Sequence, residues 1–162
     1  MVSKELLNMY DASDVRKRAF YYTYMSRTKP YKYYSGTSKL VFTYAFHLSE
    51  AYLNRAEANA ELGKTAEAMD DINEIRKNRI PDAEQLSADS KESAVELIRN
   101  ERRMELCFEG LRWFDLRRWG CPELKHVYSS SEVSDEKVEY VLKEGDKRYT
   151  LPIPRAERLM NN

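Results

Sequence analysis

Residues 47–80 carry the spacing of two α-helices joined by a tight turn, and this feature constrains the fold most. Apolar residues recur every three or four positions on both sides of the turn, as Leu48, Ala51, Tyr52 and Ala56, then Ala68, Met69, Ile72 and Ile75. Gly63 supplies the left-handed backbone conformation that ends a helix, and Thr65 can cap the next one. Because Pro81 ends the segment, the sequence predicts an antiparallel helical hairpin.

Within this hairpin, the stretch AEANAELGKTAEAMDDI resembles a tetratricopeptide unit. Small residues lie seven positions before Gly63, at Ala56, and five positions after it, at Ala68, where they allow two helices to approach closely. A single unit cannot cover its own apolar face, so either neighbouring helices cover it or the covering chain is missing. We expect a mostly α fold with a tetratricopeptide-like helical hairpin, further helices, irregular loops and little β-structure.

The other segments differ in composition, and we expect 1–162 to form a single unit. Residues 1–46 are predicted to be an aromatic-rich extended or loop segment, in which Phe20, Tyr22 and Tyr24 alternate with Tyr21, Thr23 and Met25 in the period of a strand. Residues 90–120 read as a helical block rich in arginine and aromatic residues. Residues 121–162 read as a polar loop and an extended C-terminal segment, since the two prolines of YTLPIP exclude a helix there.

The helical block contains NERRMELCFEGLRWFDLRRWG, in which acids and arginines alternate. On one continuous helix, Glu101 would adjoin an apolar face that includes Met104 and Phe108, where an unpaired carboxylate is unfavourable. Arginine is its natural partner, because a planar guanidinium binds a carboxylate through two bonds. The predicted ionic and aromatic lock consists of Glu101, Arg102, Arg103, Glu105, Arg112, Trp113, Asp115 and Arg117. The alternative is an arginine pocket for a phosphate or an acidic sugar, but the alternation of charge signs favours the lock.

A cluster of tyrosines is the candidate ligand site. Tyr31, Lys32, Tyr33 and Tyr34 lie in a predicted loop, where binding residues concentrate. Aromatic faces stack on the C–H patches of sugar rings, and Tyr and Lys can hydrogen-bond to sugar hydroxyls. These four residues are the predicted carbohydrate-binding site, although the same aromatics can simply cover the helical scaffold.

Several classes of function lack their sequence signals. Lys+Arg and Asp+Glu both total 27, which gives no global drive for nucleic-acid binding. The chain has no Gly-x-Ser-x-Gly elbow and no glycine-rich phosphate loop, so we expect neither an enzyme nor a cofactor. His47 and Glu50 have a metal-ligand spacing but lack a second ligand pair, so we expect no metal site. No apolar run approaches the ~20 residues of a membrane span.

Three blocks resemble the C-terminal part of the SusD/RagB family: AYLNRAEANAELGKTAEAMDDINEIRKNRI, then ELIRNERRMELCFEGLRWFDLRRWG, then LPIPRAERLMNN. The element YDASDVRKRAFYY fits the same family more loosely. The resemblance implies a surface lipoprotein that captures glycans or other nutrients for a SusC-like TonB-dependent transporter. It implies an outer-membrane, cell-surface location, with a lipid anchor on the full-length parent, of which this chain would be the C-terminal portion. It also implies that residues 100–120 are scaffold. The competing hypothesis is a tetratricopeptide-like adaptor that binds protein and no carbohydrate.

Overall fold

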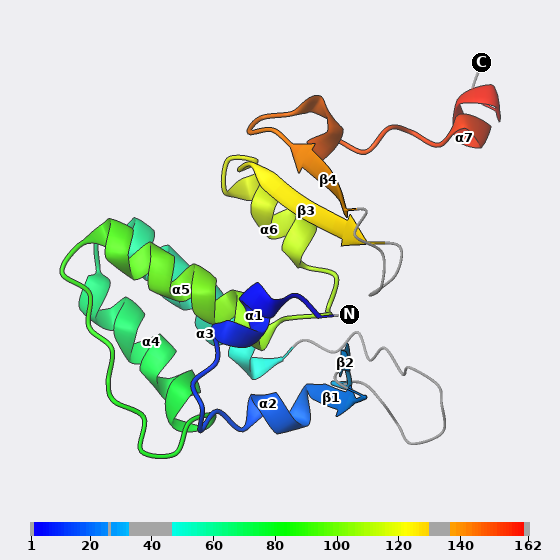
Figure 1. Ribbon diagram of the computed structural model, residues 1–162. Helices are drawn as coiled ribbons and strands as arrows, with labels where there is room; N and C mark the ends of the chain where they lie inside the picture. The colour runs from blue at the N-terminus through cyan, green and yellow to red at the C-terminus, as the bar shows by residue number, and fades with distance from the viewer. Residues whose placement is uncertain (1, 26, 33–46, 130–136, 161–162) are drawn as a thin grey trace. The chain divides into compact units, whose positions relative to one another are not determined.

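The computed structural model describes residues 2–25, 27–32, 47–129 and 137–160 (Figure 1). Those residues form seven α-helices, one 3-10 helix and two separate two-stranded sheets, which confirms the mostly helical fold predicted from the sequence. Two compact units make up the chain, Met1–Gly110 and Leu111–Asn162. The expectation that 1–162 forms one structural unit stays a prediction. Among the described helices, none combines the length and the apolar composition needed to cross a membrane.

The predicted helical hairpin is formed by α3 (Leu48–Glu61) and α4 (Thr65–Lys77). Gly63 has a φ of +78° and follows the C-cap of α3. The N–H of Lys64 donates to the carbonyl of Asn59 at 2.9 Å, and the N–H of Gly63 donates to that of Ala60 at 3.0 Å. These two bonds define a Schellman motif and satisfy carbonyls that the end of a helix leaves unpaired. Gly63 therefore ends α3 as the sequence predicts.

Helix α5 (Lys91–Glu105) covers this hairpin and packs against both of its helices. Figure 1 shows α3, α4 and α5 running side by side. Their shared core is inaccessible to solvent at Leu53, Ile72 and Ile98. Burial of each such aliphatic side chain contributes roughly 1.5–3 kcal/mol to folding. This third helix supplies the cover that a lone tetratricopeptide-like hairpin lacks.

The helical block is shorter than predicted, because α5 ends at Glu105 instead of continuing through residue 120. Phe108 and Gly110 have φ values of +67° and +77°, which no α-helix contains. The buried face of α5 includes Ala94, Ile98, Glu101 and Glu105, at spacings of four, three and four. The predicted extension of this face to Phe108 is therefore wrong.

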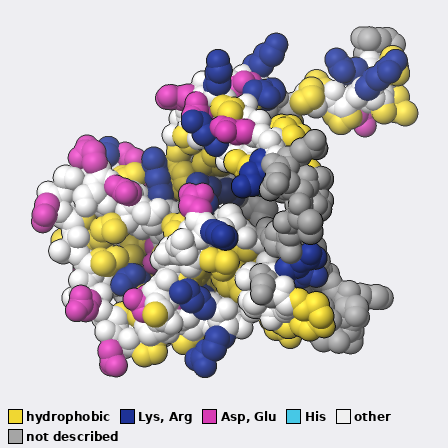
Figure 2. Space-filling view, in the orientation of Figure 1, with side chains coloured by type: hydrophobic (Ala, Val, Ile, Leu, Met, Phe, Trp, Pro, Cys, Tyr) yellow, Lys and Arg dark blue, Asp and Glu magenta, His cyan; other side chains and the backbone are white. Residues whose placement is uncertain are grey.

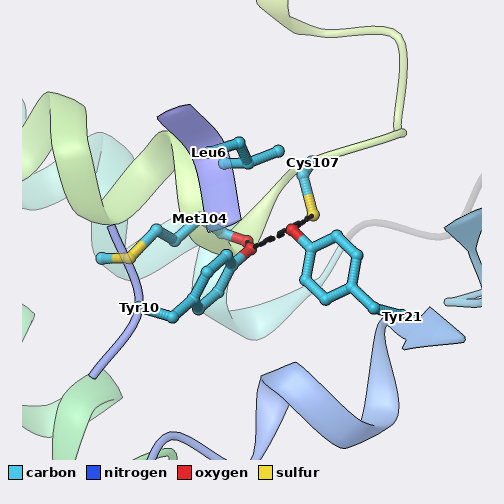
Figure 3. Packing of buried hydrophobic residues seen from close by; sticks show 5 residues of the cluster. All are labelled: Leu6, Tyr10, Tyr21, Met104 and Cys107. Atoms are coloured by element: carbon cyan, nitrogen blue, oxygen red, sulfur yellow. Dashed lines mark hydrogen bonds between the residues drawn. The ribbon is translucent and has the colours of Figure 1, made fainter. Parts of the chain in front are cut away.

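The N-terminal residues form α1 (Lys4–Asn8), α2 (Arg16–Ala19) and a hairpin of β1 (Tyr21–Tyr24) and β2 (Arg27–Pro30). Tyr21 enters a buried cluster with Leu6, Tyr10, Met104 and Cys107, shown in Figure 3. The Tyr21 hydroxyl donates to the Tyr10 hydroxyl at 2.8 Å, which in turn donates to the Met104 carbonyl at 2.8 Å. The cluster attaches the β1–β2 hairpin to the end of α5.

The second unit contains α6 (Arg112–Arg118), β3 (Leu124–Ser129), β4 (Lys137–Leu142), a 3-10 helix (Lys147–Tyr149) and α7 (Arg155–Met160). Strands β3 and β4 pair in antiparallel register, so the prediction of a plain loop after residue 120 is wrong there. Their apolar residues lie half-exposed, as at Val127 and Tyr128, and give no alternation between a buried and a polar face. Residues 151–154 have no regular secondary structure, and the short helix α7 follows them.

Candidate functional site

The β1–β2 hairpin buries Tyr21 on one side and exposes two tyrosines on the other. Successive side chains of a strand point to opposite faces, so Tyr21 lies in the core while Tyr22 and Tyr24 are 48% and 57% exposed. The register places Tyr22 opposite Lys29 and Tyr24 opposite Arg27. Residues directly opposite each other in an antiparallel pair share a face. These four side chains therefore occupy the exposed side of the hairpin.

Tyr31 extends the same surface by one position. Its N–H donates to the carbonyl of Phe20 at 2.7 Å, and its side chain is 40% exposed. The Tyr31 and Tyr22 ring centroids lie 6.1 Å apart, and those of Tyr22 and Tyr24 lie 6.4 Å apart with planes only 7° from parallel. We name the surface formed by Tyr22, Tyr24 and Tyr31 the tyrosine face. It presents three neighbouring rings to solvent.

Contacts on the other side of the hairpin hold the tyrosine face in place. The N–H of Val2 donates to the Thr28 carbonyl at 3.0 Å, at the free edge of β2. Lys32 forms an ion pair with Glu109 at 2.5 Å, donates to the Glu105 carbonyl, and lies 4.3 Å from the centre of the Phe20 ring. The Lys32 side chain is 11% exposed and is bound to protein groups. Lys32 therefore fixes the position of the backbone next to Tyr31.

The four residues of the predicted carbohydrate site thus have different places. Tyr31 belongs to the tyrosine face. Lys32 binds Glu109 and the Glu105 carbonyl and so attaches this segment to the protein. Tyr33 and Tyr34 lie outside the described residues. Sequence reasoning missed Tyr22 and Tyr24, because their alternation was interpreted as strand packing. The same alternation could have predicted that Tyr22 and Tyr24 are exposed, since successive side chains of a strand point to opposite faces and Tyr21 is buried.

A second cluster, buried and ionic, joins α5 to the N-terminal segment. Arg16 is 1% exposed, and its guanidinium donates to Asp14 at 2.8 Å, to Glu101 at 2.6 Å and to Glu105 at 2.9 Å. Arg79 binds the same Glu105 through two bonds, at 2.7 and 3.1 Å. Figure 1 shows how far apart in sequence these elements are, from α2 to α5. We name Asp14, Arg16, Arg79, Glu101 and Glu105 the ionic cluster.

Within the ionic cluster the pKa values respond to burial and to charge. Burial pushes the pKa of Glu105 upward, but the hydrogen bonds and charge of Arg79, with the charges of Arg16 and Lys32, outweigh it and lower the pKa overall. Burial also opposes the charged form of Arg16, yet its three carboxylates raise the pKa of this guanidinium. The members of the cluster pair with one another, and all of them are buried except Arg79, whose side chain is 31% exposed. A scaffold role for the cluster stays a prediction.

The arginines of the predicted lock contact other groups. Arg102 donates to Asn54 at 2.9 Å, and Arg103 donates to Glu5 at 2.7 Å. Successive residues of a helix point about 100° apart, so the side chains of Arg102 and Arg103 leave the helix in other directions than that of Glu101 and bind other groups. Sequence reasoning missed Arg16 and Arg79, although the Asp-Val-Arg element at residues 14–16 was a signal for the first.

The remaining residues of the predicted lock belong to the second unit. Arg118 donates to Asp115 at 3.1 Å, and Arg112 lies 5.5 Å from the centre of the Trp119 ring. Trp113 stacks on Tyr149 with ring centroids 4.9 Å apart, while the Arg117 side chain is exposed. The Trp113–Tyr149 contact joins α6 to the 3-10 helix. Among the side chains described, no group of three His, Cys, Asp or Glu residues is placed to hold a metal ion.

Known proteins match this chain over most of its length. The sequence model of the SusD family matches residues 8–162. A SusD-like protein of Formosa agariphila is 36% identical over 91 residues, which cover 51% of this chain and 17% of that protein. The crystal structure of a SusD-like carbohydrate-binding protein from Bacteroides vulgatus superposes with a TM-score of 0.69 at 20% identity, covering 99% of this chain and 40% of that one.

A SusD-like protein from Bacteroides fragilis gives a TM-score of 0.50 at 34% identity, covering 69% of this chain and 23% of that structure. The chain thus spans well under half the length of each of these relatives.

Proposed function

Because the chain belongs to the SusD family, we propose that it binds a carbohydrate nutrient non-covalently and releases it unchanged. The observation that supports this proposal is the tyrosine face, where three half-exposed rings lie in a row on a rigidly attached hairpin. An exposed aromatic ring retains apolar surface that water solvates poorly, and a stacked sugar ring would cover it. Weak contacts distributed over several rings suit a protein that must also release its ligand.

The role of the whole protein follows from the family. We propose that the full-length parent lies at the outer-membrane surface, held there by a lipid anchor. It would deliver its ligand to a SusC-like TonB-dependent transporter. Glycan is the ligand that the tyrosine face favours among possible nutrients, and no catalytic step is assigned to the chain.

A titration of oligosaccharides against this chain tests the proposal. We expect Tyr22→Ala and Tyr24→Ala to weaken binding about tenfold each, because a stacked ring contributes roughly 1–2 kcal/mol. Tyr128→Ala is the matched control, since this tyrosine is 52% exposed on the β3–β4 hairpin. Binding that survives both substitutions, or chromatography that shows cleaved sugar, would contradict the proposal.

An adaptor function has one observation in its favour. A hollow of about 360 Å³ lies between the start of α3 and the end of α4, lined in part by Leu48, Tyr52 and Ile75. Leu48 is 73% exposed there. An adaptor would bind a peptide in this hollow and lose it on Leu48→Lys, with no response to sugar.

A further inference from the structure

The tyrosine face is bordered by positive charge. Lys29 lies directly opposite Tyr22 across the hairpin, Arg27 lies opposite Tyr24, and both cationic side chains are exposed. We propose that the saccharide bound at the tyrosine face is anionic, with a uronic-acid carboxylate or a sulfate ester placed against Lys29. This inference rests on the proposed carbohydrate-binding function and specifies its ligand class.

The sequence around the hairpin contains basic residues but no acidic ones. From residue 15 to residue 49 the chain contains seven Lys and Arg residues and no Asp or Glu, although the whole chain has a formal net charge of zero. Two of these cations are already bound to acids outside the segment, Arg16 to the ionic cluster and Lys32 to Glu109. The tyrosine face itself contains no carboxylate.

Several exposed cations elsewhere in the first unit have acidic partners, although Lys4, Arg18 and Lys64 have none among the described residues. Arg55 pairs with Asp71 at 2.5 Å, Lys77 with Glu74 at 2.5 Å, and Lys91 with Glu61 at 2.6 Å. The side chain of Lys29, in contrast, makes no ion pair or hydrogen bond with any residue of the described ranges. An ammonium group carries three N–H donors that could bind a ligand.

The spacing of the hairpin places ring and charge within reach of one sugar unit. Cβ atoms of directly opposite residues are about 4.5–5.5 Å apart, so the side chains of Lys29 and Tyr22 start next to each other on the same face. A pyranose stacked on the Tyr22 ring would hold its own substituents at its edge, where the Lys29 ammonium group could reach them. A carboxylate or sulfate oxygen there would accept a charge-assisted hydrogen bond, which is stronger than a bond from a neutral donor. In the space-filling view, hydrophobic side chains lie close to Lys and Arg side chains where the hairpin ends (Figure 2).

Matched saccharide pairs test the inference with the complete chain. We would titrate an oligogalacturonate against its methyl ester, and a sulfated oligosaccharide against its desulfated form, by calorimetry at low and high salt. We expect the acidic member of at least one pair to bind more tightly. The preference should be roughly two- to fivefold for each exposed cation, and salt should reduce it. The pair that responds identifies carboxylate or sulfate as the source of charge.

Variants separate charge from stacking. Lys29→Gln should reduce the preference for the acidic member two- to fivefold and leave the neutral member unchanged, while Lys29→Glu should abolish the preference. Tyr22→Ala should weaken both members equally. The control is Lys64→Gln, which removes an exposed lysine at the start of α4 and should change neither.

Three outcomes overturn the inference in different ways. Equal binding of acidic and neutral members contradicts it while the proposed function stands, and would mean that Lys29 only protects an edge strand from pairing with other chains. Equally tight binding of an acidic peptide, insensitive to Tyr22→Ala, shows a charge interaction without sugar recognition. Absence of binding to every saccharide removes the proposed function itself.

Discussion

Replacement of Arg16 by methionine tests the role of the ionic cluster most directly. Methionine keeps apolar length in the site but removes the guanidinium that binds three acids. The Asp14 side chain is completely buried and would lose every bond from this group. Among the cations of the described residues, Glu101 would keep only Arg76, at 3.9 Å. Glu105 would keep its two bonds from Arg79. Two buried carboxylates therefore lose their main partner.

Removal of one partner from a buried ion pair destabilises a protein by about 3–5 kcal/mol. A domain of this size loses about 2–4 °C in melting temperature per kcal/mol, so we expect Arg16→Met to lower the melting temperature by roughly 6–20 °C. Glu101→Gln should have a smaller effect, about 1–3 kcal/mol, because the amide still accepts a bond and Arg16 keeps Asp14 and Glu105.

Urea unfolding followed by circular dichroism at pH 7 measures both variants. Lys17→Met is the control, since it removes a neighbouring cation outside the ionic cluster and should change stability by less than about 0.5 kcal/mol. The loss of unfolding free energy in Arg16→Met should also become smaller toward pH 4, because protonation removes the charge of the two buried carboxylates that have lost their partner. A loss below about 0.5 kcal/mol, or one smaller than that of Glu101→Gln, would refute the buried-pair reasoning.

Three further predictions concern single positions. Gly63→Val should lower stability by roughly 1–2 kcal/mol and Gly63→Asn by less, because asparagine tolerates positive φ; equal melting temperatures would show that the turn adapts. Tyr21→Ala should destabilise the chain by about 3–5 kcal/mol and Tyr22→Ala by under about 0.5, and similar losses in thermal unfolding would contradict the assigned strand faces. The Glu105 pKa is lowered in the folded state, so its contribution to stability is complete above its ordinary pKa of 4.5 and is lost as the pH falls further. Glu105→Gln should therefore show a shallower fall in unfolding free energy between about pH 5 and 3 than the parent chain, and parallel curves would exclude this role.

The helical hairpin could be predicted from the sequence because its signals are local. Apolar spacing within α3 and α4, and the glycine between them, depend on residues only a few positions apart. The family resemblance depended on the same kind of information, since its motifs are continuous blocks. The half-exposed β3–β4 hairpin gave no such local signal and was missed.

Partners and faces were decided by the tertiary structure. The sequence by itself determined that Glu101 would require a cation, but its partner, Arg16, lies 85 residues away and was found only in the fold. Likewise, strand alternation at residues 20–25 fixed that Tyr21 and Tyr22 point to opposite sides, and only packing against Tyr10 and Cys107 decided which side is buried. The reason is physical: periodicity is a property of one element, whereas burial and pairing depend on what another element brings against it.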